Sequence, residues 1–381
     1  MVPSIEEDLL RQLKFRGDDE ADAIAHHFQH RPAGDMFRGA IAARYAGTDM
    51  IDPHVAAWLD DMPELPDWAD RTRMANGSAF FAEWGIELGL GLFLSSLPLA
   101  YASQEGVQVL ALTARLESDT RRRVLESAQF VLDVTAPGAL EPGADGYRTV
   151  RLVRLMHAGV RDLVMRDDRV PKTGDQSVWP RWDPEWGVPI NQQHLIGAML
   201  SYSSSLLPVL DSFGVDYDAQ GAEDYCLLWN VVGWLLGIEP DLLPMDRAAM
   251  DAADPVIRKL NFGKTAAGTE MTKALIDLVR SLIGVRLLAG LPVAMMRRFI
   301  GDDTADLLGA PKANWTRYLV GAAHDMTKKV SAAALHDRAL QRVLSWTSRR
   351  VLTGFVEYER HGQRPKFVIP EHLTFRRAAR R

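Results

Sequence analysis

Residues 150–165 read VRLVRLMHAGVRDLVM and place a single histidine among aliphatic and basic side chains. The spacing predicts a helix over 148–166, in which residues three and four positions apart lie on one face. The apolar residues that share a stripe with His157 are Val153, Met156, Val160, Leu163 and Val164. His157 is therefore expected to point into the core, with Arg154 and Arg161 about one turn away on either side.

Two interpretations of His157 follow from this pattern. A histidine on an apolar face is often a core residue satisfied by one hydrogen bond. The same arrangement also suits a b-type haem, because a neutral imidazole can bind iron and aliphatic side chains can cover the porphyrin. Guanidinium groups can pair with the haem propionates. The second interpretation predicts His157 as the metal ligand and Arg154 and Arg161 as cofactor-binding residues.

A second polar group occurs in RRRVLESAQFVLDV, residues 121–134. Arg123 and Ser127 are four residues apart and share a helix face, and Glu126 lies within a turn of both. These side chains could form a solvated surface on which Glu126 pairs with Arg122. They could equally lie over a cofactor, where Arg123 and Ser127 donate hydrogen bonds and Glu126 accepts a proton. The latter hypothesis makes Arg123, Glu126 and Ser127 the candidate catalytic residues.

The elements that position these residues are predicted to be helices throughout, because apolar residues recur at helical spacing and strict alternation is scarce. The fold class is therefore all-α. Helices are expected at 4–15, 51–60, 78–95, 104–113, 118–133, 148–166, 191–213, 219–237, 270–287, 291–299, 302–308 and 332–359. Links rich in Pro and Gly separate them. The long link that contains Trp179, Trp182 and Trp186 is expected to pack down as a lid or wall.

Composition limits the classes of function. The chain has 381 residues, of which 47% are hydrophobic and 25% charged, so it can bury a large core. A net charge of -6 gives no reason to expect nucleic-acid binding. The apolar stretch 85–102 contains Glu87 and Pro98 and is interpreted as a buried helix, with no membrane span expected. With one cysteine, Cys226, and no visible export signal, a cytoplasmic location is expected.

Several motifs occur together in one order: RLMHAGVR (154–161), WGVPINQQHLIGAMLSYS (186–203), EDYCLLWNVVGWLLGI (223–238) and RRFIGDDTADLLGAP (297–311). Together they resemble the bacterial latex clearing proteins and the related fungal oxygenase of the mycophenolic acid pathway. The likeness covers roughly residues 60–310. It suggests an N-terminal helical extension over 1–60, a haem-binding oxygenase domain over 61–310 and C-terminal helices over 311–381.

The resemblance implies a large helical domain with a globin-like core, one non-covalent haem b, and dioxygen as co-substrate. The family's proximal iron ligand falls on His157, its distal arginine on Arg123 and the following threonine on Ser127. The family's distal lysine falls on Glu126, and another threonine near the haem falls on Ala198. Both of these positions depart from the family pattern.

The function expected from the resemblance is that of a haem b-dependent oxygenase. Its substrate would be an apolar, unsaturated small molecule of isoprenoid or lipid type, oxidised with cleavage of a C=C bond. The alternative is a haem or apolar-ligand binding protein without turnover, such as a sensor or carrier. Oxygen consumption that depends on a substrate separates the two hypotheses. The sequence carries no prediction of oligomeric state.

Overall fold

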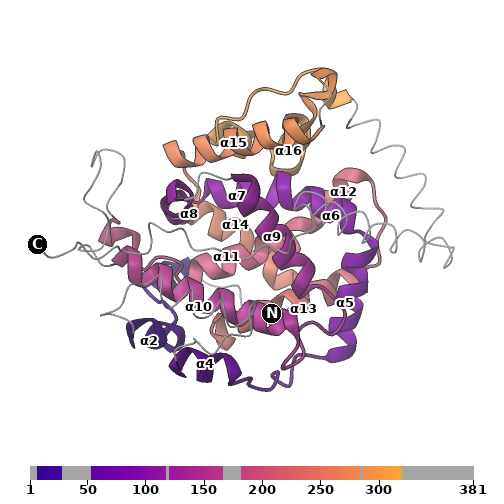
Figure 1. Cartoon of the computed structure of the whole chain (residues 1–381). Helices are drawn as coiled ribbons and strands as arrows, with labels where there is room; N and C mark the ends of the chain where they lie inside the picture. The colour runs from indigo at the N-terminus through magenta and orange to yellow at the C-terminus, as the bar shows by residue number, and fades with distance from the viewer. Residues whose placement is uncertain are drawn as a thin grey trace, which may run out of the picture.

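The computed structural model is an assembly of packed helices, shown in Figure 1. It describes residues 7–27, 53–116, 120–165, 182–283, 286–318 and 320. Over these residues the structure contains no strand, and only one isolated bridge joins Ser103 to Phe262. The all-α fold predicted from the helical spacing is confirmed.

The N-terminal half contains the helix that carries His157 and the helices that precede it in the chain. They are α1 (Glu7–Leu13), α2 (Asp19–His27), α4 (Pro53–Asp60), α5 (Arg71–Glu83), α6 (Gly85–Gly91), the π-helix η1 (Leu92–Ser96), α7 (Leu97–Ala102), α8 (Gln104–Leu116), α9 (Thr120–Val134) and α10 (Asp145–Met165). In Figure 1, α10 lies beside α2 and α4, with α9 next to it.

The C-terminal half supplies the central helix and a second layer. Its α-helices are α11 (Gln192–Tyr202), α12 (Leu207–Phe213), α13 (Ala219–Leu235), α14 (Arg247–Asn261), α15 (Ala266–Ile283), α16 (Leu291–Ile300) and α17 (Asp302–Leu307). Short 3-10 turns occur at η3 (Pro184–Trp186), η4 (Ser204–Leu206), η5 (Pro240–Leu242) and η6 (Arg286–Leu288).

The main hydrophobic cluster is centred on α13, which packs closely against α5. Gly77 permits this approach, because a Cβ at that position would lie 2.4 Å from the backbone oxygen of Asp224. The carboxylate of Asp224 also binds α5, accepting hydrogen bonds from Arg73 at 2.7 Å and Asn76 at 2.9 Å. The two helices are thus joined by both close packing and an ion pair.

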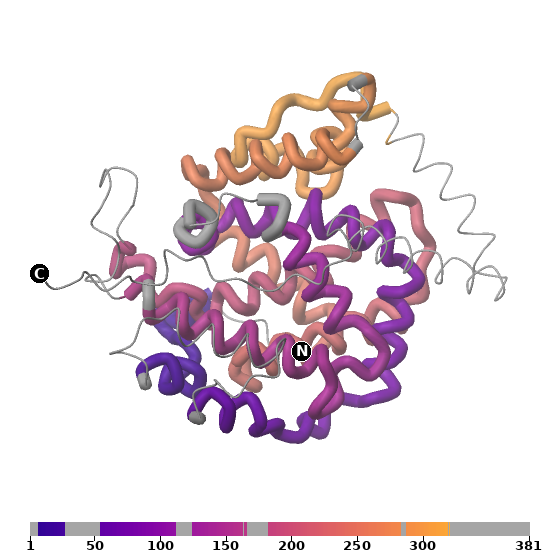
Figure 2. Tube along the Cα trace, viewed as in Figure 1, coloured from indigo at the N-terminus to yellow at the C-terminus, as the bar shows by residue number. Residues whose placement is uncertain are grey.

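A second hydrophobic cluster joins η1, α7 and α8 to α15, α16 and α17. Figure 2 shows this layer, in orange and yellow, against the purple helices of the N-terminal half. A third, smaller cluster joins α2, α4 and α10 through Ala25, Trp58 and Leu155. One face of α10 is therefore buried by α2 and α4, which come from the N-terminal part of the chain.

Several predicted helix boundaries were wrong. The predicted helix 191–213 is interrupted at Ser203, where the backbone leaves helical values, and Pro208 lies at the start of α12. The helix predicted over 78–95 is divided among α5, α6 and η1. α14 was missed because Pro255 interrupts its pattern, although the structure accommodates this proline inside the helix. The predicted helix 332–359 lies outside the described residues.

Within the described part of the chain, one helical stretch, Gly85–Ala102, is long and apolar enough to cross a membrane. Its mean hydropathy is 1.4, and 67% of it is buried inside the protein. It passes through both large hydrophobic clusters, with Leu88 in the first and Leu94 in the second. This placement agrees with the predicted buried helix.

Candidate functional site

α10 carries His157 on a face that other helices only partly cover. Leu152, Leu155 and Ala158 are buried against α2 and α4. Val153, His157 and Val160 are only half-buried. The N-terminal helices thus bury the neighbouring face of α10 completely, whereas they cover the face of His157 only in part. The result is a histidine on a partly open apolar surface.

The imidazole of His157 is electrically neutral at physiological pH. Its Nδ1 is buried and has no hydrogen-bond partner among the described residues. Burial lowers the pKa of His157 from 6.5 to about 4, and the positive charge of Arg161 adds to this effect, against the opposing effect of Asp18. A neutral imidazole retains a ring-nitrogen lone pair, which is what a metal ligand requires.

Arg154 and Arg161 lie close to His157 along α10 but bind the N-terminal segment. Arg154 donates to both carboxylate oxygens of Asp18, at 2.7 and 2.8 Å, and to Glu20 at 2.8 Å. Arg161 donates through Nε to Asp22 at 2.7 Å, while its buried Nη2 has no hydrogen bond within the described structure. Sequence spacing gave no sign of these carboxylates, which precede α10 by well over a hundred residues.

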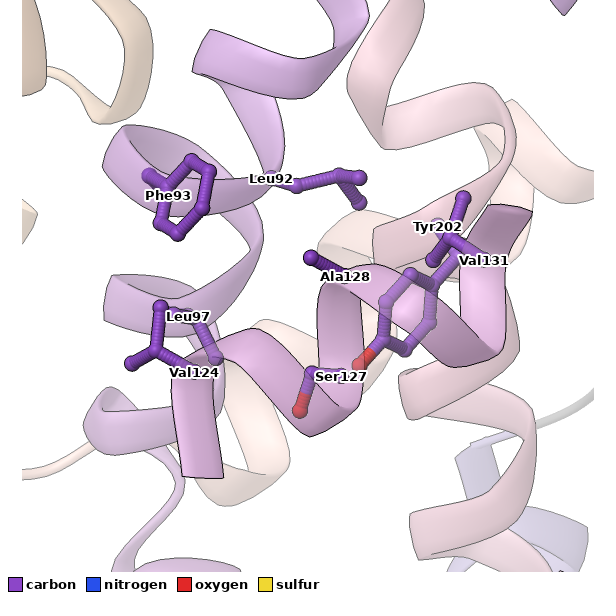
Figure 3. Close-up of a pocket in the computed structure, with 8 residues that line it drawn as sticks. All are labelled: Leu92, Phe93, Leu97, Val124, Ser127, Ala128, Val131 and Tyr202. Carbon is purple, nitrogen blue, oxygen red and sulfur yellow. The ribbon is translucent and has the colours of Figure 1, made fainter. Parts of the chain in front are cut away.

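Ser127 of α9 lines a small apolar pocket. The space between its lining side chains, part of which is open solvent, amounts to about 240 Å³. Its lining comes from η1, α7, α9 and α11: Leu92, Phe93, Leu97, Val124, Ser127, Ala128, Val131 and Tyr202. In Figure 3 the hydroxyl oxygens of Ser127 and Tyr202 lie at the edge of the pocket away from Leu92 and Phe93. The pocket thus combines an apolar wall with two hydroxyl groups.

The π-helix η1 explains how Leu92 and Phe93 reach this pocket. Pro98 has no N–H to donate, and its ring would clash with the preceding turn of a regular α-helix. The chain widens there instead, and the N–H of Leu97 bonds to the carbonyl of Leu92, five residues back. Such π-turns are often found at functional sites. The proline in LFLSSLP is a sequence signal for this feature.

Tyr202 was not predicted from the sequence. Its ring stacks on Trp229, with ring centroids 5.0 Å apart and an interplanar angle of 14°. Burial raises the pKa of Tyr202 above its usual value, so the phenol keeps its proton at neutral pH. The hydroxyl therefore remains able to donate a hydrogen bond, and stacking fixes its direction.

The three candidate catalytic residues all lie on α9. Ser127 lines the pocket, whereas Glu126 is half-buried and is not part of the lining. The backbone of Arg123 is helical, but its side chain lies outside what the structure describes. Since α9 packs directly against α10, the candidate polar residues and His157 lie on neighbouring helices.

His194, in the first turn of α11, is a second half-buried histidine whose ring nitrogens are fully buried. Neither ring nitrogen has a hydrogen-bond partner in the described structure. Burial lowers the pKa of His194 from 6.5 to about 4. His194, Ala198 and Tyr202 are spaced four residues apart and share one face of α11. Ala198, in the middle, is exposed, so part of this face is open.

The tryptophan-rich link is described only from residue 182 onward, and Trp179 lies outside the described residues. Trp182 and Trp186 meet edge to face, with ring centroids 5.3 Å apart. The adjoining Val188 N–H donates to the carbonyl of Lys14 at 2.9 Å. This part of the link packs on the N-terminal segment, and its role as a lid stays a prediction.

Among the described residues, no group of three or more His, Cys, Asp or Glu side chains could hold a metal ion. A b-type haem needs only one or two axial donors from the protein, because its porphyrin supplies the other four nitrogens. His157 fits that requirement as a neutral donor on an apolar, partly open surface.

Comparison with known proteins places this arrangement in a family. The family model described as "ER-bound oxygenase mpaB/B'/Rubber oxygenase, catalytic domain" matches residues 74–352. A "Rubber oxygenase" of Streptomyces sp. (strain K30) is 23% identical over 328 residues, which cover 82% of this chain and 74% of that protein. The fold resembles the solved "Structure of Latex Clearing Protein LCP in the closed state", with a TM-score of 0.71, 22% identity, and coverage of 94% of this chain and 95% of that chain. Since the family model spans well over half of the sequence, the chain belongs, as its motifs predicted, to the mpaB and rubber oxygenase catalytic-domain family.

Proposed function

We propose that the protein is a cytoplasmic, haem b-dependent oxygenase that uses dioxygen to oxidise an apolar, unsaturated substrate of isoprenoid or lipid type. Membership of an oxygenase family supports the reaction class. The observation that carries the haem assignment is His157, a neutral imidazole with a buried, unpartnered Nδ1 on the half-exposed apolar face of α10.

His157 would hold the haem iron through its imidazole, and Val153 and Val160 would contact the porphyrin along the same face. The haem, when bound, supplies the activation of dioxygen. Arg154 Nη1 and Arg161 Nη2 make none of the hydrogen bonds through which these arginines bind Asp18, Glu20 and Asp22. We assign these two nitrogen atoms as the hydrogen-bond donors to the haem propionates.

The pocket between α9, η1 and α11 would receive the reacting part of the substrate. Leu92, Phe93 and Leu97 provide an apolar wall that excludes water. The hydroxyls of Ser127 and Tyr202 would donate hydrogen bonds to oxygen atoms as charge develops on them. Glu126, one residue from Ser127, would accept or return a proton at its carboxylate.

Cleavage of a C=C bond is the reaction that best suits such a pocket. The alkene gives up its double bond, dioxygen gives up its O–O bond, and each carbon takes one oxygen atom to become a carbonyl. Atoms and electrons balance without an external reductant. The apolar lining of the pocket suits a hydrocarbon substrate, and Leu92, Phe93 and Leu97 would have to move apart to admit it. The name "Rubber oxygenase" of the Streptomyces relative points to the same isoprenoid chemistry.

The visible absorption spectrum of the full chain, expressed with a haem supply, tests the cofactor. We expect a Soret band in the parent protein and its loss in His157→Ala, because one axial bond and the packing around it supply much of the haem affinity. His54→Ala, at an exposed position in α4, is the control and should keep the band. Stoichiometric haem with an unchanged spectrum in His157→Ala would refute the assignment.

Oxygen consumption tests turnover. The haem-loaded protein should consume dioxygen in the presence of an unsaturated isoprenoid and should yield carbonyl products in step with the oxygen used. A Soret band without any such consumption would favour the alternative, a haem or apolar-ligand binding protein that acts as a sensor or carrier. The replacement of the family's lysine by Glu126 is compatible with that alternative.

A further inference from the structure

A second cleft lies in the layer formed by α16, α17 and the segment that follows them. It encloses about 820 Å³ of space and is open to solvent. Its lining is Ala294, Arg297, Arg298, Asp302, Lys312, Ala313, Arg317 and Val320. No residue is shared with the pocket lined by Ser127 and Tyr202. Four of the lining side chains are basic and one is acidic.

Two of the four cations are already neutralised and hold the cleft together. The guanidinium of Arg297, which is 6% exposed, donates to Asp302 at 2.5 Å and to Asp306 at 2.6 Å. It also donates to the backbone oxygens of Ala310 and Pro311. Arg297 thereby ties α16 to α17 and to the segment after it, and the walls of the cleft are fixed relative to one another.

Lys312 is the other neutralised cation. Its Nζ lies 2.6 Å from Oδ2 and 2.8 Å from Oδ1 of Asp306. Asp306 thus receives both Arg297 and Lys312, and these contacts lower its pKa. The positive charges of Arg297 and Lys312 are therefore balanced by carboxylates within the fold.

Arg298 and Arg317, the other two cations of the lining, donate hydrogen bonds to uncharged groups. Arg298 donates through Nε to the backbone oxygen of Ser212 at 3.1 Å, and Arg317 donates through Nη2 to the hydroxyl of Tyr318 at 2.9 Å. Neither has a carboxylate partner among the described residues. They come from two different elements yet line one cleft, so two positive charges that no described carboxylate balances face the same space.

We propose that this cleft binds a phosphate group through Arg298 and Arg317. Guanidinium groups bind phosphate oxygens through paired, charge-assisted hydrogen bonds. A tetrahedral phosphate can present oxygens to both side chains at once. Arg297 and its carboxylates supply the rigid support, and Lys312 is held in the wall by its ion pair with Asp306.

The phosphate could belong to a soluble phosphate ester or to a lipid headgroup. Trp315 and Tyr318 flank Arg317 and are 45% and 66% exposed. Aromatic side chains of this kind settle at the interface between lipid and water. The chemistry of the site is the same for both sources, and the experiment below distinguishes them.

The full-length protein is titrated with inorganic phosphate by calorimetry and is sedimented with phosphatidylcholine vesicles that contain or lack phosphatidic acid. The test variant is Arg298→Gln/Arg317→Gln, in which two exposed arginines lose their charge while the Arg297 contacts remain. Arg71→Gln is the matched control, because Arg71 is also exposed and pairs with Glu141 far from the cleft. Circular dichroism checks that each variant is folded.

We expect the double variant to bind phosphate at least about tenfold more weakly than the parent, because charge-assisted contacts are lost. The Arg71 control should bind as the parent does. Co-sedimentation that requires phosphatidic acid and is lost in the double variant would identify a lipid headgroup. Phosphate binding without vesicle binding would identify a soluble ester. Absence of both forms of binding in the parent, or equal binding by parent and double variant, would overturn the proposal.

Discussion

Replacing Asp18 by Asn removes the negative charge that holds two arginines of α10. Asp18 is 5% exposed, and the side chains of Arg154 and Arg161 are 11% and 3% exposed. The asparagine keeps the shape of the side chain and can still accept the hydrogen bond from the N–H of Ala21. The change therefore isolates the ion pair from the helix cap.

The magnitude follows from what the arginines retain. Breaking a buried ion pair costs about 3–5 kcal/mol, because one charge is left without its partner. Here Arg154 keeps Glu20 and Arg161 keeps Asp22, so neither charge is left alone and the loss falls at or below the lower end of that range. We expect Asp18→Asn to lower the free energy of unfolding by about 2–3 kcal/mol.

Urea unfolding at pH 7, followed by far-UV circular dichroism, measures this loss. Asp60→Asn, at an exposed position at the end of α4, is the control and should change stability by less than about 0.5 kcal/mol. An Asp18→Asn protein as stable as the Asp60→Asn protein would refute the reasoning. Haem content, measured on the same samples, reports separately on the propionate assignment of Arg154 and Arg161.

Three further predictions concern other parts of the structure. The pKa of His194 is about 4 in the folded protein against 6.5 unfolded, so its contribution to stability is present above pH 6.5 and is lost as the pH falls toward 4. His194→Leu should reduce that acid sensitivity, by at most about 3 kcal/mol, and an unchanged pH profile of the unfolding midpoint would contradict the prediction. Glu126→Gln should lower oxygen consumption or abolish a pH-dependent change of the ferric spectrum, and full retention of both properties would remove Glu126 from the site. Gly77→Ala should destabilise the protein by about 2–3 kcal/mol, since its Cβ would meet the backbone of Asp224 at 2.4 Å, and an unchanged melting temperature would show that α5 shifts freely.

The sequence predicted the helix that carries His157 and its unusual histidine, because a period of 3.6 residues is a local property. How far other helices cover that histidine could not be predicted from local spacing. Whether Val153 or Leu155 is covered depends on α2, which lies far away in the chain and supplies Asp18. Partners brought together by the fold alone are invisible to spacing arguments.

The residues that line the pocket could also be predicted only in part from the sequence. Ser127 was a candidate because of its spacing from Arg123, but Tyr202 was not, since the helix predicted over 191–213 gave no reason to single it out. Its role depends on the end of α11 at Ser203 and on its stacking against Trp229. The motifs that carried the family resemblance were more informative than periodicity, because they record many such tertiary constraints together.

The π-turn at Leu92–Ser96 amounts to one residue more than a regular helix would need over the same length. An α-helix advances about 100° per residue, so deleting Ser95 would turn everything on its N-terminal side by roughly that angle relative to α7. Leu92 and Phe93 would then leave the pocket wall, while the helix itself would become more regular. The shape of this pocket is thus set by the rotational position of a single helix, and a one-residue insertion or deletion there would change the pocket wall in a way that point substitutions do not.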